Sequence, residues 1–214
     1  PLETIQTNVI GNTNILEACR EQKIERFVFA STVYVYSEMA SFYRASKQAS
    51  ELIIESYKEK FDLNFTILRY GSLYGPRANK FNFIRNIIEQ ALNEGKISRK
   101  GDGQEIRDYI HVKDAAQSSV EILSDTYKNQ HVIITGTQSA KVSKVLSMIQ
   151  EMLNKNIEIE YLPERIEEHY RITPYSFRPQ VAKSLVLRNY HDLGQGLLDC
   201  IYEIYSDLGV KKNG

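Results

Sequence analysis

Residues 26–32 have the sequence Arg26-Phe27-Val28-Phe29-Ala30-Ser31-Thr32, an apolar run that ends in two hydroxyl side chains. A short continuous apolar run predicts a buried strand. The residues before it keep helical spacing from Leu2 to about Gln22, so a helix leads into this strand. The same order follows at once, because residues 41–60 predict a second helix and residues 64–69 a second strand. Alternating helices and strands predict parallel crossover units and an α/β fold.

The rest of the chain continues this pattern less regularly. Apolar spacing through Phe81 and Ile84 predicts a third helix, which Gly95 ends as a C-cap. The later elements are a turn at 100–104, an extended segment at 107–112, a helix near 113–126, a strand at 131–135, a helix at 142–153, a strand at 157–161 and a helix from Gly194 to about Leu208. Residues 162–192 hold three of the five prolines and predict irregular structure.

Composition limits the classes of function. Lys plus Arg and Asp plus Glu number 27 each, and without a long block of like charge we expect no nucleic-acid or membrane partner. No apolar run approaches about 18 residues and the first residues resemble no signal peptide, so a soluble cytoplasmic protein is expected. Cys19 and Cys200 lie in apolar helical patterns, which predicts buried thiols and no metal site.

Tyr43 and Lys47 stand four residues apart in the second predicted helix. Side chains at this spacing lie one above the other, so an ammonium can sit beside a phenol. Lowering a tyrosine pKa from about 10 by about 3 units requires roughly 4 kcal/mol, which a nearby cation can supply. The pair is therefore a candidate base with its activating cation. The alternative is a solvated surface pair.

Five motifs follow one another along the chain. They are NVIGNT at 8–13, FVFASTVYVY at 27–36, Tyr43 with Lys47, LRY at 68–70 with YGPR at 74–77, and GDG at 101–103 with RDYIHVKD at 107–114. Together they resemble the extended short-chain dehydrogenase/reductases, in the NAD-dependent epimerase/dehydratase family that acts on nucleotide sugars. The resemblance implies a Rossmann-like doubly wound parallel sheet lacking its first strands, with a small interleaved C-terminal α/β domain. Residues 1–75 would belong to the NAD-binding and catalytic domain and residues 76–214 mostly to the substrate-binding region, with about 105–135 returning to the sheet.

The resemblance also implies the catalytic roles. Tyr43 would remove a proton from a sugar hydroxyl while hydride passes to the nicotinamide of NAD. Lys47 would lower the pKa of Tyr43 and bind the nicotinamide ribose. Thr32 would hold the reacting hydroxyl and relay its proton. In the alternative interpretation, Ser31 and Thr32 only end a strand and cap local backbone groups.

Binding roles follow from the same resemblance. The residues implied for NAD are Asn8, Ser31, Tyr43, Lys47 and Tyr70, and those implied for a nucleotide-diphosphate sugar are Thr32, Ser72, Arg77, Arg107 and Arg178. Arg107 is the candidate for the diphosphate, because a guanidinium can bind phosphate oxygens as a fork. The alternatives are a surface role for Arg107, an aromatic plug at Tyr70 and a backbone bridge at Asn8.

Several departures from the family pattern limit which activity and which parts of the family fold we expect in this chain. The glycine fingerprint for a dinucleotide is absent, so we expect roughly 90 residues, three units of about 30, before Pro1. Thr32 and Tyr43 are only eleven positions apart, about half the spacing expected from the family. Val33 and Tyr34 stand where dehydratases carry the Asp-Glu pair that eliminates water, which disfavours dehydration.

A 4-epimerase is therefore the leading hypothesis. A reductase or dehydratase of the same family is one alternative, and a truncated, non-catalytic interaction module is another. Related enzymes pair as dimers, so a homodimer through helices 2–22 and 41–60 is expected.

Overall fold

The computed structural model describes residues 1–37, 41–153, 156–163 and 182–212. The chain forms two compact units. The first comprises Pro1–Gly71, Gln117–Ile134 and Glu167–Val186, and the second comprises Ser72–Ala116, Thr135–Ile166 and Leu187–Gly214. The chain thus passes repeatedly from one unit to the other.

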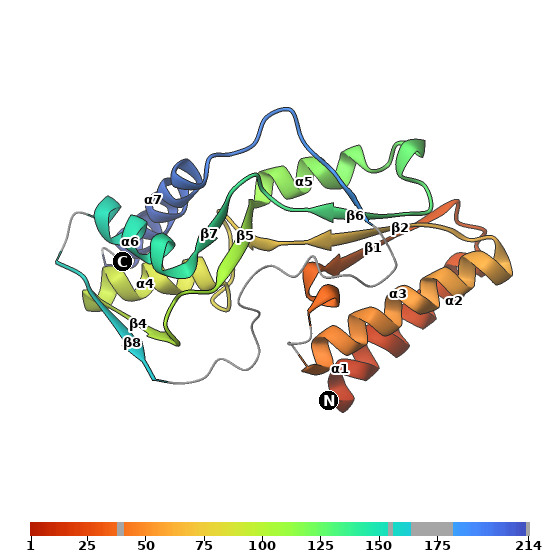
Figure 1. The fold of residues 1–214 in the computed structure, drawn as a ribbon, viewed down its shortest axis with the longest axis horizontal. Helices are drawn as coiled ribbons and strands as arrows, with labels where there is room; N and C mark the ends of the chain where they lie inside the picture. The colour runs from red at the N-terminus through yellow and green to blue at the C-terminus, as the bar shows by residue number, and fades with distance from the viewer. Residues whose placement is uncertain (38–40, 154–155, 164–181, 213–214) are drawn as a thin grey trace. The chain divides into compact units, whose positions relative to one another are not determined.

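The first unit is built on a parallel sheet with the strand order β1-β2-β6-β9 (Figure 1). The strands are β1 (Arg26–Thr32), β2 (Asn64–Tyr70), β6 (Gln130–Ile134) and β9 (Lys183–Ser184). Thr32 lies opposite Tyr70 in the β1–β2 pair, so the two strands end level with each other. The predicted parallel α/β arrangement is confirmed. The two-residue strand β9 was not predicted, because so short a strand carries no alternating pattern.

Helices beside β1 and β2 complete this unit. They are α1 (Leu2–Ile5), the π-helical turn η1 (Gln6–Ile10), α2 (Gly11–Glu21) and α3 (Ser41–Phe61), and α2 and α3 lie side by side (Figure 1). The core between helices and sheet consists of Leu16, Phe29, Ile54, Leu63, Phe65 and Ile67. Ser46 and Ser50 on α3 are fully buried, and their small side chains let α3 approach η1 closely.

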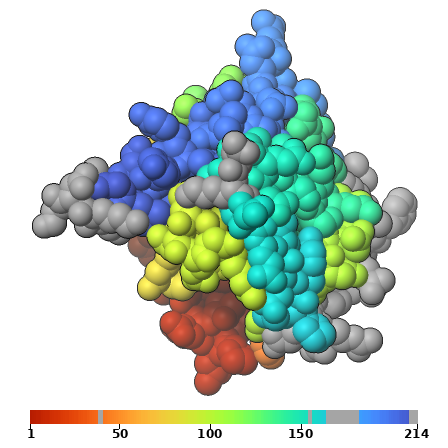
Figure 2. Space-filling model, turned by 90° about the vertical axis from the view of Figure 1, so that its left-hand side faces the viewer, coloured from red at the N-terminus to blue at the C-terminus, as the bar shows by residue number. Residues whose placement is uncertain are grey.

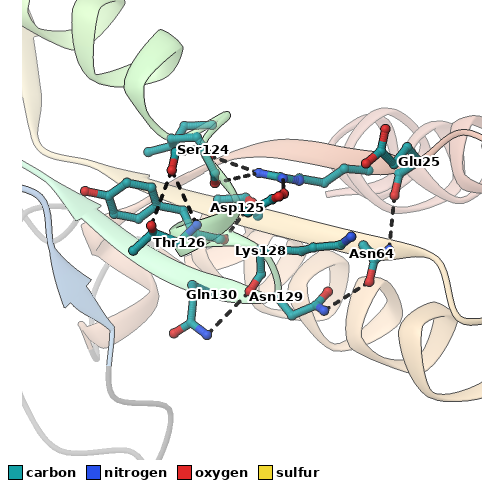
Figure 3. A network of polar contacts seen from close by, with 12 residues as sticks. Glu25, Asn64, Ser124, Asp125, Thr126, Lys128, Asn129 and Gln130 are labelled. Atoms are coloured by element: carbon teal, nitrogen blue, oxygen red, sulfur yellow. Dashed lines mark hydrogen bonds and ion pairs between the residues drawn. The ribbon is translucent and has the colours of Figure 1, made fainter.

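A polar network holds the amino ends of the strands (Figure 3). Arg26, the first residue of β1, donates to the carbonyl of Ser124 at 3.1 Å and pairs with Asp125 at 2.8 Å. Asn129 has a left-handed φ of 57° and donates to the side chain of Asn64 at 3.0 Å. These contacts fix where β1, β2 and β6 begin, at the edge of the sheet opposite Thr32.

The second unit contains two further small sheets. One has the order β3-β5-β7, formed by Ser72–Tyr74, Ile106–His111 and Ser139–Lys141, and the other pairs β4 (Lys96–Lys100) with β8 (Glu158–Leu162). Helices α4 (Phe83–Glu94), α6 (Val142–Leu153) and α7 (Leu193–Lys212) pack together, with α7 in blue and α6 in teal in Figure 2. Their shared core includes Ile84, Ile87, Ile88, Ala91, Val145, Leu146, Ile149 and Leu197.

The structure refines several predicted elements. Gly95 ends α4 with a φ of 65°, as predicted. The helix expected near 113–126 is the shorter α5 (Val112–Glu121), followed by the 3-10 turn η3 (Asp125–Tyr127). Phe81 precedes α4 and is 84% exposed, because Asn82 caps the helix by accepting from the backbone N–H of Arg85.

The segment that returns to the first unit is narrower than the expected 105–135. It comprises Gln117–Ile134, because β5 pairs with β3 and β7 of the second unit. The strands β3, β4 and β7 were not predicted: β3 and β7 have three residues each, and β4 has a single apolar side chain, Ile97.

Candidate active site

Tyr43 and Thr32 meet where β1 ends and α3 begins, within the first unit. A hydrogen bond joins their side chains. Thr32 is buried with 7% of its surface exposed, whereas Tyr43 exposes 45%. The partly exposed Tyr43 side chain is therefore backed by a buried hydroxyl, which is the arrangement a proton relay needs.

Thr32 owes its position to the local backbone. Its extended conformation, with φ −147° and ψ 151°, ends β1, and its side chain accepts from the backbone N–H of Tyr34 at 3.2 Å. Thr32 thereby caps the 3-10 turn η2 (Val33–Tyr36). The capping role and the contact with Tyr43 occur together, so the alternative interpretation of Thr32 describes only part of what it does.

Lys47 lies one helical turn beyond Tyr43 on α3. Its ammonium donates to the carbonyl of Ala30 at 2.9 Å and lies 4.7 Å from the ring centroid of Phe29. The distance from the ammonium to the ring centroid of Tyr43 is 5.9 Å. Burial lowers the pKa of Lys47, and the nearby Glu51 carboxylate partly offsets this.

The pKa of Tyr43 differs from the expectation. Burial, the largest cause, raises the pKa of Tyr43, and the hydrogen bond from Thr32 lowers it in part. The predicted lowering of this pKa by Lys47 is not seen. The physical reason is that the ammonium is engaged by the Ala30 carbonyl, while the Tyr34 ring packs against Tyr43 in a T-shaped pair with 6.4 Å between centroids.

Asn8 supports α3 from the neighbouring π-helical turn. Its side-chain amide donates to the Ser46 hydroxyl at 2.9 Å, and that hydroxyl donates to the carbonyl of Tyr43 at 2.8 Å. The Ser50 hydroxyl donates to the carbonyl of Asn8 at 2.7 Å. π-Helical turns are frequent at functional sites, and this one connects to the backbone of Tyr43 through the Ser46 hydroxyl.

Ser31 and Tyr70, both predicted to contact NAD, have partners within the first unit. Ser31 is 5% exposed and its hydroxyl donates to Glu51 at 2.5 Å. The Tyr70 hydroxyl lies 2.5 Å from that of Ser119 on α5. Ser31 is therefore a buried support of the site, and Tyr70 remains a candidate at the carboxyl end of β2.

Besides Thr32, three of the residues predicted to bind the nucleotide sugar lie in described ranges. All three belong to the second unit. Arg107 on β5 is 6% exposed and donates to the carbonyl of Ile106 at 3.2 Å. Ser72 begins β3. The backbone N–H of Arg77 donates to both carboxylate oxygens of Glu203, at 2.7 and 3.0 Å. Arg178 lies outside the described residues.

An open hollow of about 340 Å³ adjoins Arg77 in the second unit. Its lining combines polar and apolar groups: Leu73, Tyr74, Gly75, Pro76, Arg77, Ala78, Asn79, Phe81, Asn82 and Val112. A guanidinium and two amides beside aromatic rings suit a ligand with both a charged and a planar part.

Comparison with known proteins places the chain in a family. The model of the NAD dependent epimerase/dehydratase family matches residues 1–135. The chain belongs to this family. A curated epimerase/dehydratase relative from Bacillus subtilis (strain 168), the uncharacterized UDP-glucose epimerase YtcB, is 30% identical over 72% of this chain and 53% of its own length. The UDP-glucuronate 4-epimerase of Thermodesulfobacterium geofontis is 23% identical over 76% of this chain and 54% of its own length. The chain thus spans about half the length of these two relatives.

Solved epimerase structures share the fold. The UDP-N-acetylglucosamine 4-epimerase of Methanobrevibacter ruminantium M1, in complex with UDP-N-acetylmuramic acid, has a TM-score of 0.80 at 24% identity and covers 97% of this chain and 71% of its own. The UDP-glucuronic acid 4-epimerase of Bacillus cereus, in complex with UDP-glucuronic acid and NAD, has a TM-score of 0.81 at 23% identity, covering 94% and 68%. The Rossmann-like fold class predicted for this family member is confirmed.

A group of buried polar side chains on α3, β2 and β6 was not predicted from the sequence. Glu51 on α3 and Arg69 on β2 form a buried ion pair at 2.6 Å, and His131 on β6 contacts Arg69 at 3.0 Å and Glu55 at 2.7 Å. A sequence signal existed, because an arginine inside the apolar strand NFTILRY requires a buried partner. Glu51 lies one turn beyond Lys47 and is the carboxylate within reach.

The described residues contain neither a candidate metal site nor a helix that could span a membrane. Across residues 1–37, 41–153, 156–163 and 182–212, no group of three or more His, Cys, Asp and Glu side chains is arranged to hold a metal ion. Over the same stretches, every helix is too short or too polar to span a bilayer.

The buried histidines make stability depend on pH. Burial is the largest cause that lowers the pKa of His131 and of His111, and Arg69 acts in the same direction on His131. The unfolded chain therefore binds more protons than the folded chain just below the ordinary histidine pKa of 6.5, and the free energy of unfolding falls as pH decreases through this range.

We expect His131→Gln to reduce part of this dependence of unfolding free energy on pH, measured by urea titrations between pH 5 and about 7.5. An unchanged slope in this variant would contradict the assignment.

Proposed function

We propose that this chain is the catalytic and substrate-binding part of an NAD-dependent nucleotide-sugar 4-epimerase. The single observation that carries the proposal is the cluster of Tyr43, Thr32 and Lys47 at the carboxyl end of β1. Ligands of open α/β sheets gather at the carboxyl ends of the strands. The names of the relatives, which include UDP-glucose and UDP-glucuronate epimerases, support the substrate class.

In the proposed reaction Tyr43 is the base. For this step Tyr43 must be the phenolate, which takes the proton of the C4 hydroxyl of the sugar while Thr32 holds that hydroxyl and relays the proton. NAD, which Lys47 and Tyr43 would hold by its nicotinamide ribose, would supply the acceptor and donor of the C4 hydride. The 4-keto sugar rotates between these two steps, so the hydroxyl reforms with the opposite configuration. Tyr43 then returns the proton to the C4 oxygen.

The side chains present fit the nicotinamide end of the cofactor. An ammonium and a phenol on one face of α3 are donors suited to ribose hydroxyls. Lys47 already contacts the end of strand β1, which carries Thr32. These 214 residues contain no glycine fingerprint for the pyrophosphate. We therefore propose that this chain supplies the catalytic groups and that the pyrophosphate is held by residues outside it.

The second unit is proposed to bind the nucleotide diphosphate. Arg107 and Arg77 of this unit provide guanidinium groups, and Ser72 provides a hydroxyl. Arg178, which lies outside the described residues, stays a further candidate on its sequence alone. Guanidinium forks match phosphate oxygens in charge and geometry. The hollow beside Arg77 offers room for part of the nucleotide.

The chemistry after oxidation distinguishes an epimerase from its relatives. Val33 is 1% exposed and has no group that ionises, and Tyr34 carries no carboxyl, so the Asp-Glu pair of a dehydratase has no counterpart at these positions. Decarboxylases also occur among the relatives, such as the UDP-N-acetyl-alpha-D-glucosaminuronate decarboxylase of Bacillus cytotoxicus, 25% identical over 89% of this chain. Epimerisation needs no group beyond the Tyr, Thr, Lys and NAD set, which favours it.

A product assay tests the proposal. The complete protein, with any residues that flank these 214, is incubated with NAD and separately with UDP-glucose, UDP-glucuronate and UDP-N-acetylglucosamine. Products are resolved by chromatography and proton NMR. We expect the C4 epimer of at least one substrate. A 4-keto-6-deoxy sugar or released carbon dioxide as the main product would overturn the epimerase assignment in favour of a dehydratase or decarboxylase. NAD binding without turnover of any of the three would reject it for these substrates.

The helices beside the site are proposed to form a homodimer. Exposed apolar side chains lie on α1, α2 and α3, among them Leu2 at 86%, Ile15 at 54% and Leu52 at 61%. We expect Leu52→Glu to convert a dimer into a monomer in light scattering after size-exclusion chromatography. The matched control is Tyr202→Glu on α7, where the side chain is 77% exposed and the dimer should persist. An unmodified protein that is monomeric at micromolar concentration would refute the pairing.

A further inference from the structure

A buried carboxylate on the catalytic helix is bound by two elements of the sheet. Glu51 is 5% exposed and Arg69 is 3% exposed. The guanidinium of Arg69 binds Glu51 as a fork, with Nε 3.1 Å from Oε1 and Nη2 2.6 Å from Oε2. The Ser31 hydroxyl donates to the same carboxylate at 2.5 Å. The carboxylate thus connects α3 to both β1 and β2.

The guanidinium of Arg69 also contacts two side chains besides Glu51, those of Tyr36 and His131. Arg69 donates to the hydroxyl of Tyr36 on η2, and its guanidinium carbon lies 4.7 Å from the centroid of that ring. Arg69 Nη2 lies 3.0 Å from His131 Nδ1. An arginine can only donate, so Nδ1 must accept, and the proton of a neutral His131 sits on Nε2. That Nε2–H donates to Glu55 of α3 at 2.7 Å.

Two of the proposed catalytic groups, Thr32 and Lys47, lie next to members of this network. Ser31 directly precedes Thr32, and Glu51 lies one helical turn from Lys47. The carbonyl that binds the Lys47 ammonium belongs to Ala30, the residue before Ser31. Tyr43, Lys47, Glu51 and Glu55 follow one another at intervals of four along one face of α3. A shift of α3 along β1 would therefore break the network and displace Tyr43 relative to Thr32.

Stability alone is a weak reason for such a pair. Removing two charges from water is costly, and apolar side chains of similar volume often stabilise a fold as well or better. What an ion fork provides is a fixed geometry, because bidentate contacts tolerate little displacement. The position of this fork, beneath the ends of the strands that carry the site, matches that use.

We propose that the Glu51–Arg69 pair, braced by Ser31, Tyr36 and His131, is a positioning device that sets the placement of Tyr43 and Lys47 on α3 against Thr32 on β1. This inference rests on the proposed function for its kinetic consequence. Glu51 and Arg69 are positioning residues and contact neither substrate nor cofactor in this scheme.

The test compares Arg69→Lys with Arg26→Lys in the complete protein. Lysine keeps the charge but cannot reproduce the fork at Glu51. Arg26 is a matched control, because it is another arginine of the same sheet, with 10% of its side chain exposed, whose carboxylate partner Asp125 lies at the opposite edge (Figure 3). Steady-state kinetics with NAD and the active UDP-sugar give kcat and KM. Hydrogen exchange followed by mass spectrometry reports the local order of residues 30–36 and 41–51.

We expect Arg69→Lys to lower kcat by roughly 10- to 100-fold with KM changed less than about threefold, since small misplacement of reacting groups has effects of this size. Exchange in 30–36 and 41–51 should rise several-fold. Arg26→Lys should leave kcat within about twofold and raise exchange only near the amino edge of the sheet. Glu51→Gln, which keeps the side-chain shape, replaces Arg69→Lys if the latter does not fold.

Two results would overturn the proposal. One is a kcat of Arg69→Lys that matches that of Arg26→Lys, and the other is unchanged exchange in 41–51. If the unmodified protein turns over no UDP-sugar, the proposed function fails while exchange still decides the positioning role: loosening of 41–51 by Arg69→Lys supports it, and unaltered exchange refutes it.

Discussion

Replacing Tyr43 by phenylalanine should lower kcat by roughly 10²- to 10⁴-fold, the range that a general base contributes. The substitution removes one oxygen from a side chain that is 45% exposed, so the fold should be retained. It also removes the acceptor for the proton of the C4 hydroxyl, and Thr32 has no route to replace it because its own proton requires an acceptor. Lys47 is unchanged, so NAD binding should persist.

The measurement is turnover of the active UDP-sugar together with NAD binding by fluorescence. Tyr57→Phe is the matched control. Tyr57 lies on the same helix and its hydroxyl donates to Glu17 at 2.5 Å, so this variant loses one hydrogen bond between α3 and α2 while the site stays intact. More than a tenth of the original kcat in the Tyr43 variant would show that another group is the base.

A substitution at a residue with no role in the proposed proton chemistry should also have a large effect. Gly136 packs against β5, and a Cβ at this position would lie 2.0 Å from the carbonyl oxygen of Tyr109. The obstacle is backbone, so no side chain can turn away to make room. We expect Gly136→Ala to reach or exceed the roughly 3 kcal/mol at the upper end of ordinary overpacking. For a chain of this size this corresponds to a decrease in Tm of about 6–12 °C.

Thermal unfolding followed by circular dichroism checks this expectation. Gly11→Ala is the control, because its Cβ would meet its nearest neighbour, the carbonyl oxygen of Gln6, at an ordinary 3.6 Å. An alanine inside a helix should be neutral or stabilising by up to about 1 kcal/mol. If the two variants melt at the same temperature, the close approach at Gly136 is not a constraint on the fold.

Long elements with one clear periodicity were predictable from the sequence. The strands at 26–30 and 64–69 and the helices at 41–60 and 142–153 occur nearly as expected, since each carries enough apolar residues to define a buried face. The short strands β3 and β7 could not be predicted this way. Their three residues pair with β5, and that pairing depends on contacts distant in the sequence.

The candidate site was predictable where it depends on local spacing. The i, i+4 relation of Tyr43 and Lys47 and the strand end at Thr32 follow from helix and strand geometry alone. The orientation of the Ser31 side chain could not be predicted from local geometry. Its hydroxyl donates to Glu51, which lies twenty residues later in the sequence. The direction of the Tyr43 pKa was also missed, since it depends on how deeply the phenol is buried and on the carbonyl of Ala30 that engages Lys47.

The strand order β1-β2-β6-β9 has a consequence for synthesis on the ribosome. β2 ends at Tyr70 and its next neighbour begins at Gln130, so about 60 residues of other structure are made in between. At roughly 5–20 residues per second this takes about 3–12 s. During that interval the nascent chain presents Phe65, Ile67 and Leu68 on a strand with one unpaired edge, a template for aberrant pairing. The growing polypeptide should therefore depend on chaperones most strongly between the emergence of β2 and that of β6.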